Sequence, residues 1–85
     1  MTFKNWMKRN YISASGPRGK LARDIRDDEK FPINGTSKFD AWRVILRSHL
    51  VHHDACDDCL DTFDACWKEY ELCERKRLNM HLSGV

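Results

Sequence analysis

Residues 59–73 carry large apolar side chains and cysteines at intervals of three or four residues, and this spacing limits the possible folds more than any other feature of the chain. Because an α-helix turns once in about 3.6 residues, one helix would carry all of these side chains on a single face. Most residues between them are Asp, Glu or Lys, so the opposite face is charged. We therefore expect a helix that forms one wall of a core, with three of the four cysteines as free thiols on the buried face. That face consists of Cys59, Phe63, Cys66, Trp67, Tyr70 and Cys73.

The length of 85 residues allows a single domain, which we expect over residues 1–78, followed by a frayed tail over residues 79–85. Hydrophobic residues make up 41% of the chain and aromatic residues 11%, which is enough for a compact core. No apolar run approaches the roughly 20 residues that span a bilayer, and no signal-peptide stretch follows Met1. We therefore expect a cytoplasmic protein with no membrane contact, in a reducing compartment that keeps its cysteines as thiols.

Helical spacing and turn residues predict an all-α fold of four main helices, with room for a fifth short one, and no stretch alternates as a strand would. Thr2 is the expected N-cap of a first helix that ends before the break at residues 13–17. Pro17 suits the first turn of a second helix, which should run to about Asp28. Small residues on the second helix indicate a close approach to a neighbouring segment.

The second half of the chain predicts two further helices. We expect Ser37 to cap a third helix that ends near Leu50, and Asp54 to cap a last helix that reaches about Arg77, with residues 52–53 in the connection between them. The largest apolar side chains of all segments should converge into one core. They are Phe3, Trp6, Leu21, Ile25, Phe31, Phe63, Trp67 and Tyr70.

Several of these residues form a pattern when they are taken in chain order. The pattern consists of Phe3, Trp6, Leu21-Ala22, Asp24-Ile25, Asp28, Phe31-Pro32, Phe63, Trp67 and Tyr70. Over roughly residues 2–71 it resembles the YozE family of small bacterial and phage proteins. The resemblance implies a SAM-like (sterile alpha motif-like) helical bundle, and it implies no activity because the family has no assigned biochemical role. The cysteines and the basic extension from Arg75 onward lie outside the motif.

For Asp24 and Asp28 we expect a structural role, as a cap of the turn at residues 31–32 or as the partner of an arginine.

Charge is segregated along the chain although the net charge is only +2. Residues 1–30 carry eight Lys or Arg against four Asp or Glu, and residues 31–53 carry three against one, which gives +6. Residues 54–74 carry one against eight, which gives −7, and residues 75–77 add +3. Such a chain either pairs its own oppositely charged parts or steers a charged partner onto one side.

A non-enzymatic protein-interaction module is the function we favour, because the SAM-like domains that the chain resembles often bind proteins and because segregated charge offers complementary patches. Candidate contact residues are apolar residues outside the expected core, together with an acidic helix face. They are Tyr11, Ile12, Ile33, Val44, Asp57, Asp61 and Asp64. One concrete version is a phage-borne inhibitor that covers a host factor with the acidic face. Neither the partner's identity nor an oligomeric state follows from these residues.

Non-specific nucleic-acid binding is the alternative function. Basic residues of the first two helices would form one surface, and phosphate contacts alone supply such affinity. The candidates are Lys8, Arg9, Arg18, Lys20, Arg23 and Arg26. The net charge of only +2 and the acidic last helix count against this alternative.

Metal binding and catalysis have weaker support in the sequence. Cys56 and Cys59 form a C-x-x-C with His53 just before it, but the second ligand pair of a structural zinc site is missing. No strand precedes the C-x-x-C as a redox motif requires, and no base is fixed beside a cysteine nucleophile. The acidic run at residues 54–64 lacks the glycine turn of a calcium loop. We therefore expect no enzymatic activity, no cofactor and no resident metal.

Overall fold

The structure is a computed structural model that describes the backbone of residues 1–83 and the side chains of residues 1–79. Within these residues the chain forms four α-helices and no strand, as the sequence predicted. The helices are α1 (Phe3–Tyr11), α2 (Gly16–Asp27), α3 (Phe39–His52) and α4 (Asp57–Ser83). No helix among these residues has both the length and the apolar character needed to cross a membrane.

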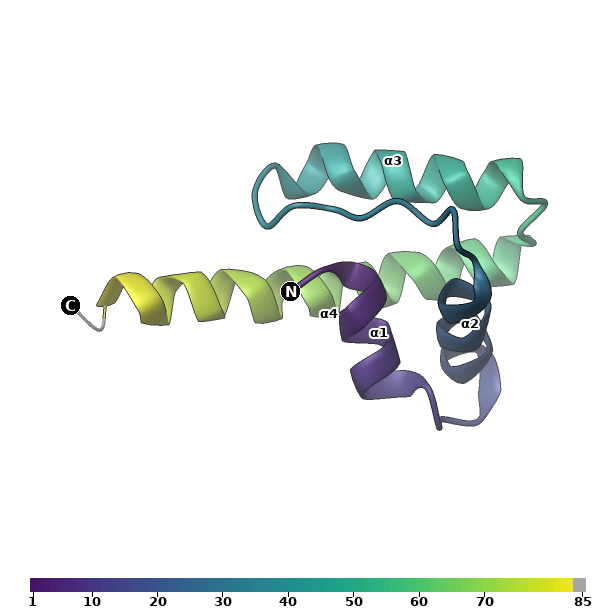
Figure 1. Ribbon diagram of the computed structural model, residues 1–85, viewed down its shortest axis with the longest axis horizontal. Coiled ribbons are helices and arrows are strands. Elements are labelled where there is room, and N and C mark those ends of the chain that lie inside the picture. Colours follow the sequence, from purple (N-terminus) through teal and green to yellow (C-terminus); the bar gives the residue numbers. More distant parts are fainter. Residues whose placement is uncertain (84–85) are drawn as a thin grey trace.

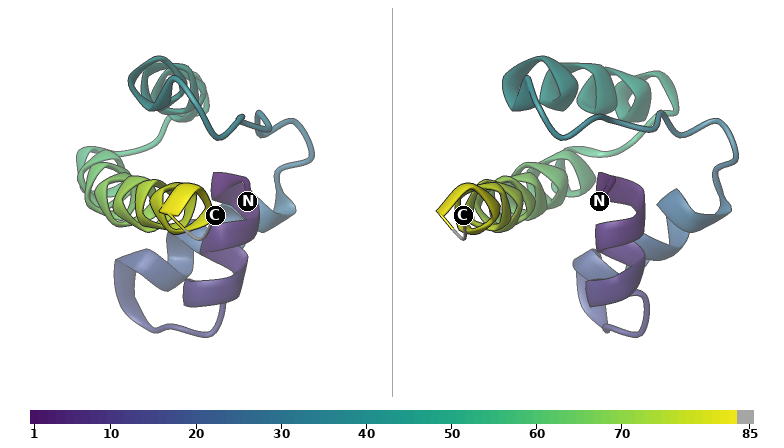
Figure 2. Two further views of the ribbon diagram at one scale, coloured as in Figure 1. Left: turned by 90° about the vertical axis from the view of Figure 1, so that its left-hand side faces the viewer. Right: turned by 60° about the vertical axis from the view of Figure 1, so that its left-hand side comes forward.

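Helix α4 is the longest element, and the others are arranged around its first half. Helix α3 runs along one side of α4, whereas α1 and α2 cross the other side, as Figures 1 and 2 show. Helices α1 and α2 also pack against each other, but α3 packs against α4 and against no other helix in residues 1–83. The connection from α2 to α3 passes beside α3 (Figure 1). One long side of α3 is therefore left without a helical neighbour.

The first two helices begin and end where their residues predict. The Thr2 hydroxyl accepts a hydrogen bond from the Asn5 N–H at 3.2 Å, which confirms Thr2 as the N-cap of α1. Pro17 lies in the first turn of α2, where its missing donor costs nothing. Gly19 is buried against the turn before α2: a Cβ at this position would lie 1.7 Å from the Ala14 carbonyl oxygen. Only glycine allows the two segments to approach this closely.

The predicted boundaries of α3 and α4 are wrong by a few residues. Helix α3 starts after Lys38, which has a left-handed backbone (φ 53°), rather than after a Ser37 cap, and it continues to His52. Asp54 does not cap α4, which starts only at Asp57. Instead Asp54 has a left-handed backbone (φ 60°) and its N–H bonds the Val51 carbonyl, while the N–H of residue 55 bonds the carbonyl of residue 50. These two bonds form a Schellman motif, so Asp54 ends α3, a position where Asp tolerates the left-handed conformation.

The last helix is longer than predicted. It was expected to end near Arg77 but continues to Ser83, so the expected frayed tail of residues 79–85 overlaps α4. Residues 84–85 of that tail lie outside the described part of the chain.

The core contains all eight side chains that the sequence assigned to it. Phe3 lies at its centre, with ring centroids 5.2 to 5.4 Å from those of Phe63, Trp67 and Tyr70. Such edge-on and tilted contacts between aromatic rings stabilise the core beyond the area they bury. Helix α4 thus supplies the wall against which α1 packs.

The cysteines only partly follow the prediction. All four described cysteines are free thiols; Cys66 is fully buried and Cys59 is half-buried, but Cys73 is exposed, as is Cys56. Cys73 is exposed because the next buried residue of α4 after Tyr70 is Glu74, which lies one helical turn further along the same face. The Glu74 carboxylate binds the terminal amine of Met1 at 3.1 Å, so a charged pair closes this end of the core.

Candidate functional site

A groove of about 790 Å³ lies between α2 on one side and, on the other, the connection from α3 to α4 and the first turn of α4. Its floor is apolar and is formed by core side chains. Its rim is polar and carries five carboxylates, from Asp24, Asp27, Asp28, Asp54 and Asp58, together with Lys20 and His53. An apolar floor with converging polar groups is typical of a ligand site.

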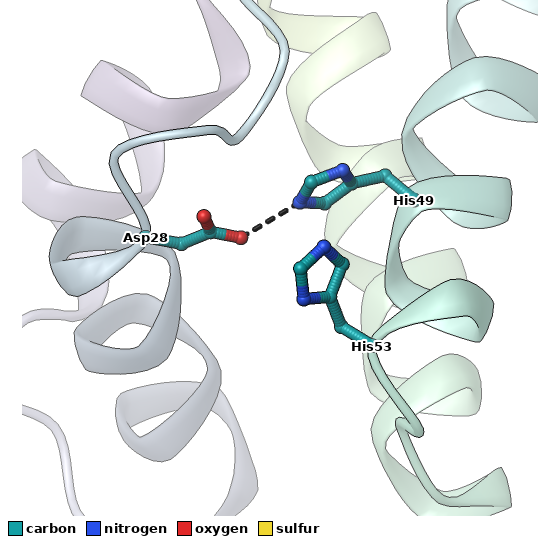
Figure 3. A group of neighbouring side chains, drawn as sticks. All are labelled: Asp28, His49 and His53. Atoms are coloured by element: carbon teal, nitrogen blue, oxygen red, sulfur yellow. Dashed lines mark hydrogen bonds and ion pairs between the residues drawn. The ribbon is translucent and has the colours of Figure 1, made fainter.

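Three side chains from two parts of the chain meet in Figure 3, and two of them, Asp28 and His53, line this groove. Asp28 follows the last residue of α2, whereas His49 and His53 lie one turn apart at the end of α3. His49 Nε2 and Asp28 Oδ2 are 2.7 Å apart, and the centroids of the two imidazole rings are 4.3 Å apart. One carboxylate oxygen and one nitrogen of each ring all lie within 4.8 Å of one another. We call Asp28, His49 and His53 the Asp-His-His cluster.

The carboxylate of this cluster is held as an anion by its hydrogen bonds. The hydrogen bond with His49 lowers the pKa of Asp28, against the effect of burial, and the bond from the Lys30 N–H lowers it further. The Lys30 N–H bonds Oδ1 at 3.0 Å, which leaves Oδ2 for His49. The Phe31 ring meets the His49 ring edge-on, with centroids 5.4 Å apart. Two of the three side chains of the cluster are therefore already fixed in position.

The cluster differs from the zinc ligands that the sequence suggested. His53 belongs to it, but Cys56 and Cys59 do not; no group of described residues brings the ligand atoms of all three together. Both cysteines line the groove, and burial is the main cause of the raised pKa of Cys59. His49 was not among the metal-ligand candidates predicted from the sequence. The sequence does contain a pattern that indicates it: residues 49 and 53 have the i, i+4 spacing that places two histidines on one helix face.

A second candidate surface is the outer face of α3, which we define by Ala41, Val44, Ile45, Ser48 and Val51. Of these, Val44 is 55% exposed, Ile45 46% and Val51 49%. A shallow depression on this face is bordered by Arg47 and His52. The face follows the helical repeat and has no helical neighbour in the described chain.

The apolar candidates for partner contact fall into two groups. Tyr11 and Ile12 pack against the edge of the core, and the Tyr11 hydroxyl donates to Glu69. That bond is the first cause of the raised pKa of Tyr11. Ile33 and Val44 are exposed, at 62% and 55%. Only the second pair offers free apolar surface.

The acidic candidates also differ from one another. Asp57 and Asp61 are exposed on α4. Asp64 binds Arg47 at 3.2 Å and Arg43 at 3.9 Å, so it joins α4 to α3. The oppositely charged segments of the chain therefore pair within the fold at this point.

Several candidate basic residues are likewise bound within the chain. Arg18 donates to Glu69, to the Tyr11 hydroxyl and to Cys66 Sγ. Arg23 donates to two backbone carbonyls of the turn before α2, and Arg26 binds Asp27 beside it in sequence. Lys8, Arg9 and Lys20 are exposed. The basic surface available for phosphate contacts is thus smaller than the sequence suggested.

Comparison with protein families matches residues 2–72 to the model described as the YozE SAM-like fold, which confirms the resemblance and the fold that it implies. No curated protein and no solved structure matches the chain.

Proposed function

We propose, from the premise that the chain belongs to the YozE SAM-like family, that it is a non-enzymatic module that binds a partner protein through the outer face of α3. The observation that carries this proposal is the half-exposure of Val44, Ile45 and Val51 on one side of a single helix. Exposed apolar residues scattered singly are common on protein surfaces, whereas apolar side chains gathered on one face of a helix favour a contact surface.

The chemistry of the face suggests what the partner presents. Burial of the exposed halves of three such side chains would contribute about 1 kcal/mol each, half of the roughly 1.5–3 kcal/mol of full burial. Arg47 and His52 border the depression on the face, and only Asp40 of α3 is acidic. Arg47 binds Asp64 of α4 through Nε, and its guanidinium has further N–H donors for a second carboxylate. The face therefore suits an apolar helix or ridge that has carboxylates at its rim.

Affinity capture with matched variants tests this proposal. The wild-type protein should retain a specific partner that the double variant Val44→Asp/Val51→Asp loses. Leu72→Asp is the matched control, because Leu72 is also exposed, at 69%, but lies on α4. Circular dichroism should show that all variants are folded. A partner that binds the double variant as well as the wild type would refute the role of this face.

Two further variants separate the alternatives. The double variant Asp57→Ser/Asp61→Ser should leave binding unchanged, whereas loss of the partner would favour an inhibitor that uses the acidic face of α4. The affinity of the protein for a generic nucleic-acid duplex, measured at increasing salt concentration, tests the nucleic-acid alternative. Tight binding that weakens steeply with salt and is lost in Lys8→Ala/Arg9→Ala would favour nucleic acid over the protein partner.

A further inference from the structure

We propose that the Asp-His-His cluster binds a divalent transition-metal ion such as Zn²⁺. Two imidazoles and one carboxylate are a ligand set that such ions accept, and the ligand atoms already lie within 4.8 Å of one another. In a tetrahedral zinc site, with bonds of about 2.0–2.1 Å, neighbouring ligand atoms are roughly 3.3 Å apart. A small opening of the 2.7 Å contact between Asp28 and His49 and a rotation of the exposed His53 ring would reach this geometry.

The surroundings of the cluster favour binding. The Asp28 Oδ1 atom is held by the Lys30 N–H, and the His49 ring is held by Phe31, so these two ligands are oriented before the ion arrives. Such supporting contacts are typical of metal ligands. Because the Asp28 carboxylate can only accept a hydrogen bond, His49 Nε2 must be the donor in this pair. Metal binding requires this nitrogen as a lone-pair donor, so the imidazole proton would move to Nδ1.

The cluster also offers an open coordination position. Asp28 and His53 both line the groove between α2 and the connection from α3 to α4. Three protein ligands beside an accessible groove leave the fourth position for water or for an incoming ligand. The ion would also join the end of α2 to the end of α3, two helices whose backbones do not approach each other closely within residues 1–83. This proposal does not depend on the outer face of α3.

Titration of the chelator-treated, reduced protein with Zn²⁺, followed by calorimetry, tests the site. We expect one equivalent of zinc to bind. His53→Ala and Asp28→Asn should each weaken zinc binding by more than about tenfold. Loss of a residue that only hydrogen-bonds a metal ligand already lowers metal affinity by about 10–100-fold, and loss of a ligand itself should cost at least as much. Asp28→Asn keeps an oxygen acceptor for His49 and removes the anionic ligand, and His53 is exposed, so both variants should fold.

Two controls make the result specific. His52→Ala removes the neighbouring exposed histidine of α3 and should leave the affinity unchanged. Cys56→Ser/Cys59→Ser should also bind normally, and the Co²⁺ complex should lack the intense thiolate absorption of a cysteine site. Absence of saturable binding, or binding that survives His53→Ala and is lost in the cysteine variant, would overturn the proposal. Zinc should also raise the midpoint of thermal unfolding of the wild type but not of His53→Ala.

Discussion

Replacement of Asn34 by alanine should remove about 2–4 kcal/mol of the free energy of unfolding. Asn34 is only 4% exposed, and its amide joins three parts of the fold. Its Oδ1 accepts from the Phe3 N–H at 2.8 Å, and its Nδ2 donates to the Tyr70 hydroxyl and to the Gly35 carbonyl, each at 2.8 Å. The connection between α2 and α3 is held to α1 and α4 by these bonds.

The magnitude follows from what each partner loses in Asn34→Ala. The buried Phe3 N–H would have no acceptor, at a cost of about 1–3 kcal/mol. The Tyr70 hydroxyl would keep its own bond to the Met1 carbonyl, so its loss is a single ordinary hydrogen bond of roughly 0.5–1.5 kcal/mol. The carbonyl of the exposed Gly35 can bond to water instead. A domain of this kind has only about 5–15 kcal/mol of total stability, so the loss is large.

Urea unfolding, followed by tryptophan fluorescence and by circular dichroism, measures this change. Asn10→Ala is the matched control, because the exposed Asn10 makes one side-chain bond, to the Trp6 carbonyl, and should change stability by less than about 0.5 kcal/mol. A double-mutant cycle with Tyr70→Phe should give a coupling energy of about 0.5–1.5 kcal/mol. Equal destabilisation by Asn34→Ala and Asn10→Ala, or a coupling of zero, would refute this account of the network.

Three other predictions concern the close helix approach and the buried titratable groups. Gly19→Ala should cost about 3 kcal/mol by urea unfolding, because its Cβ would strike a backbone oxygen, whereas Gly35→Ala should cost little; equal effects would contradict the contact. Cys66 should react with a disulfide reagent far more slowly than Cys56, since burial raises the pKa of the Cys66 thiol and covers it; equal native rates would refute this. Burial likewise raises the pKa of Tyr70, so both groups keep their protons in the folded state after the unfolded chain has released them. Stability should therefore be unaffected by these groups below pH 9.0 and should fall as the pH rises past their ordinary values of 9.0 and 10.0; a constant urea midpoint across this range would be inconsistent with that sign.

The sequence predicted the helices and the core well but their ends less well. The core side chains are large and recur at helical spacing, so they identify themselves without knowledge of the fold. The ends of α3 depended on two residues in left-handed conformations, Lys38 and Asp54. Neither is a glycine, so the sequence carried little signal for these turns. The prediction that Cys73 is buried was wrong for a related reason. The sequence did not show that Glu74, rather than Cys73, would be buried beside the terminal amine.

The helical pattern of the chain, and with it the SAM-like fold, was determined by the sequence alone, because hydrophobic periodicity is local information that each segment carries by itself. The tertiary structure decided which groups meet. Asp28 is separated from His49 by 21 positions, and only the placement of α3 relative to the end of α2 brings them to 2.7 Å. The same placement covers one side of α3 with α4 and leaves Val44 and Val51 exposed. Contacts between distant segments depend on how helices pack against one another, and that packing is a property of the whole chain.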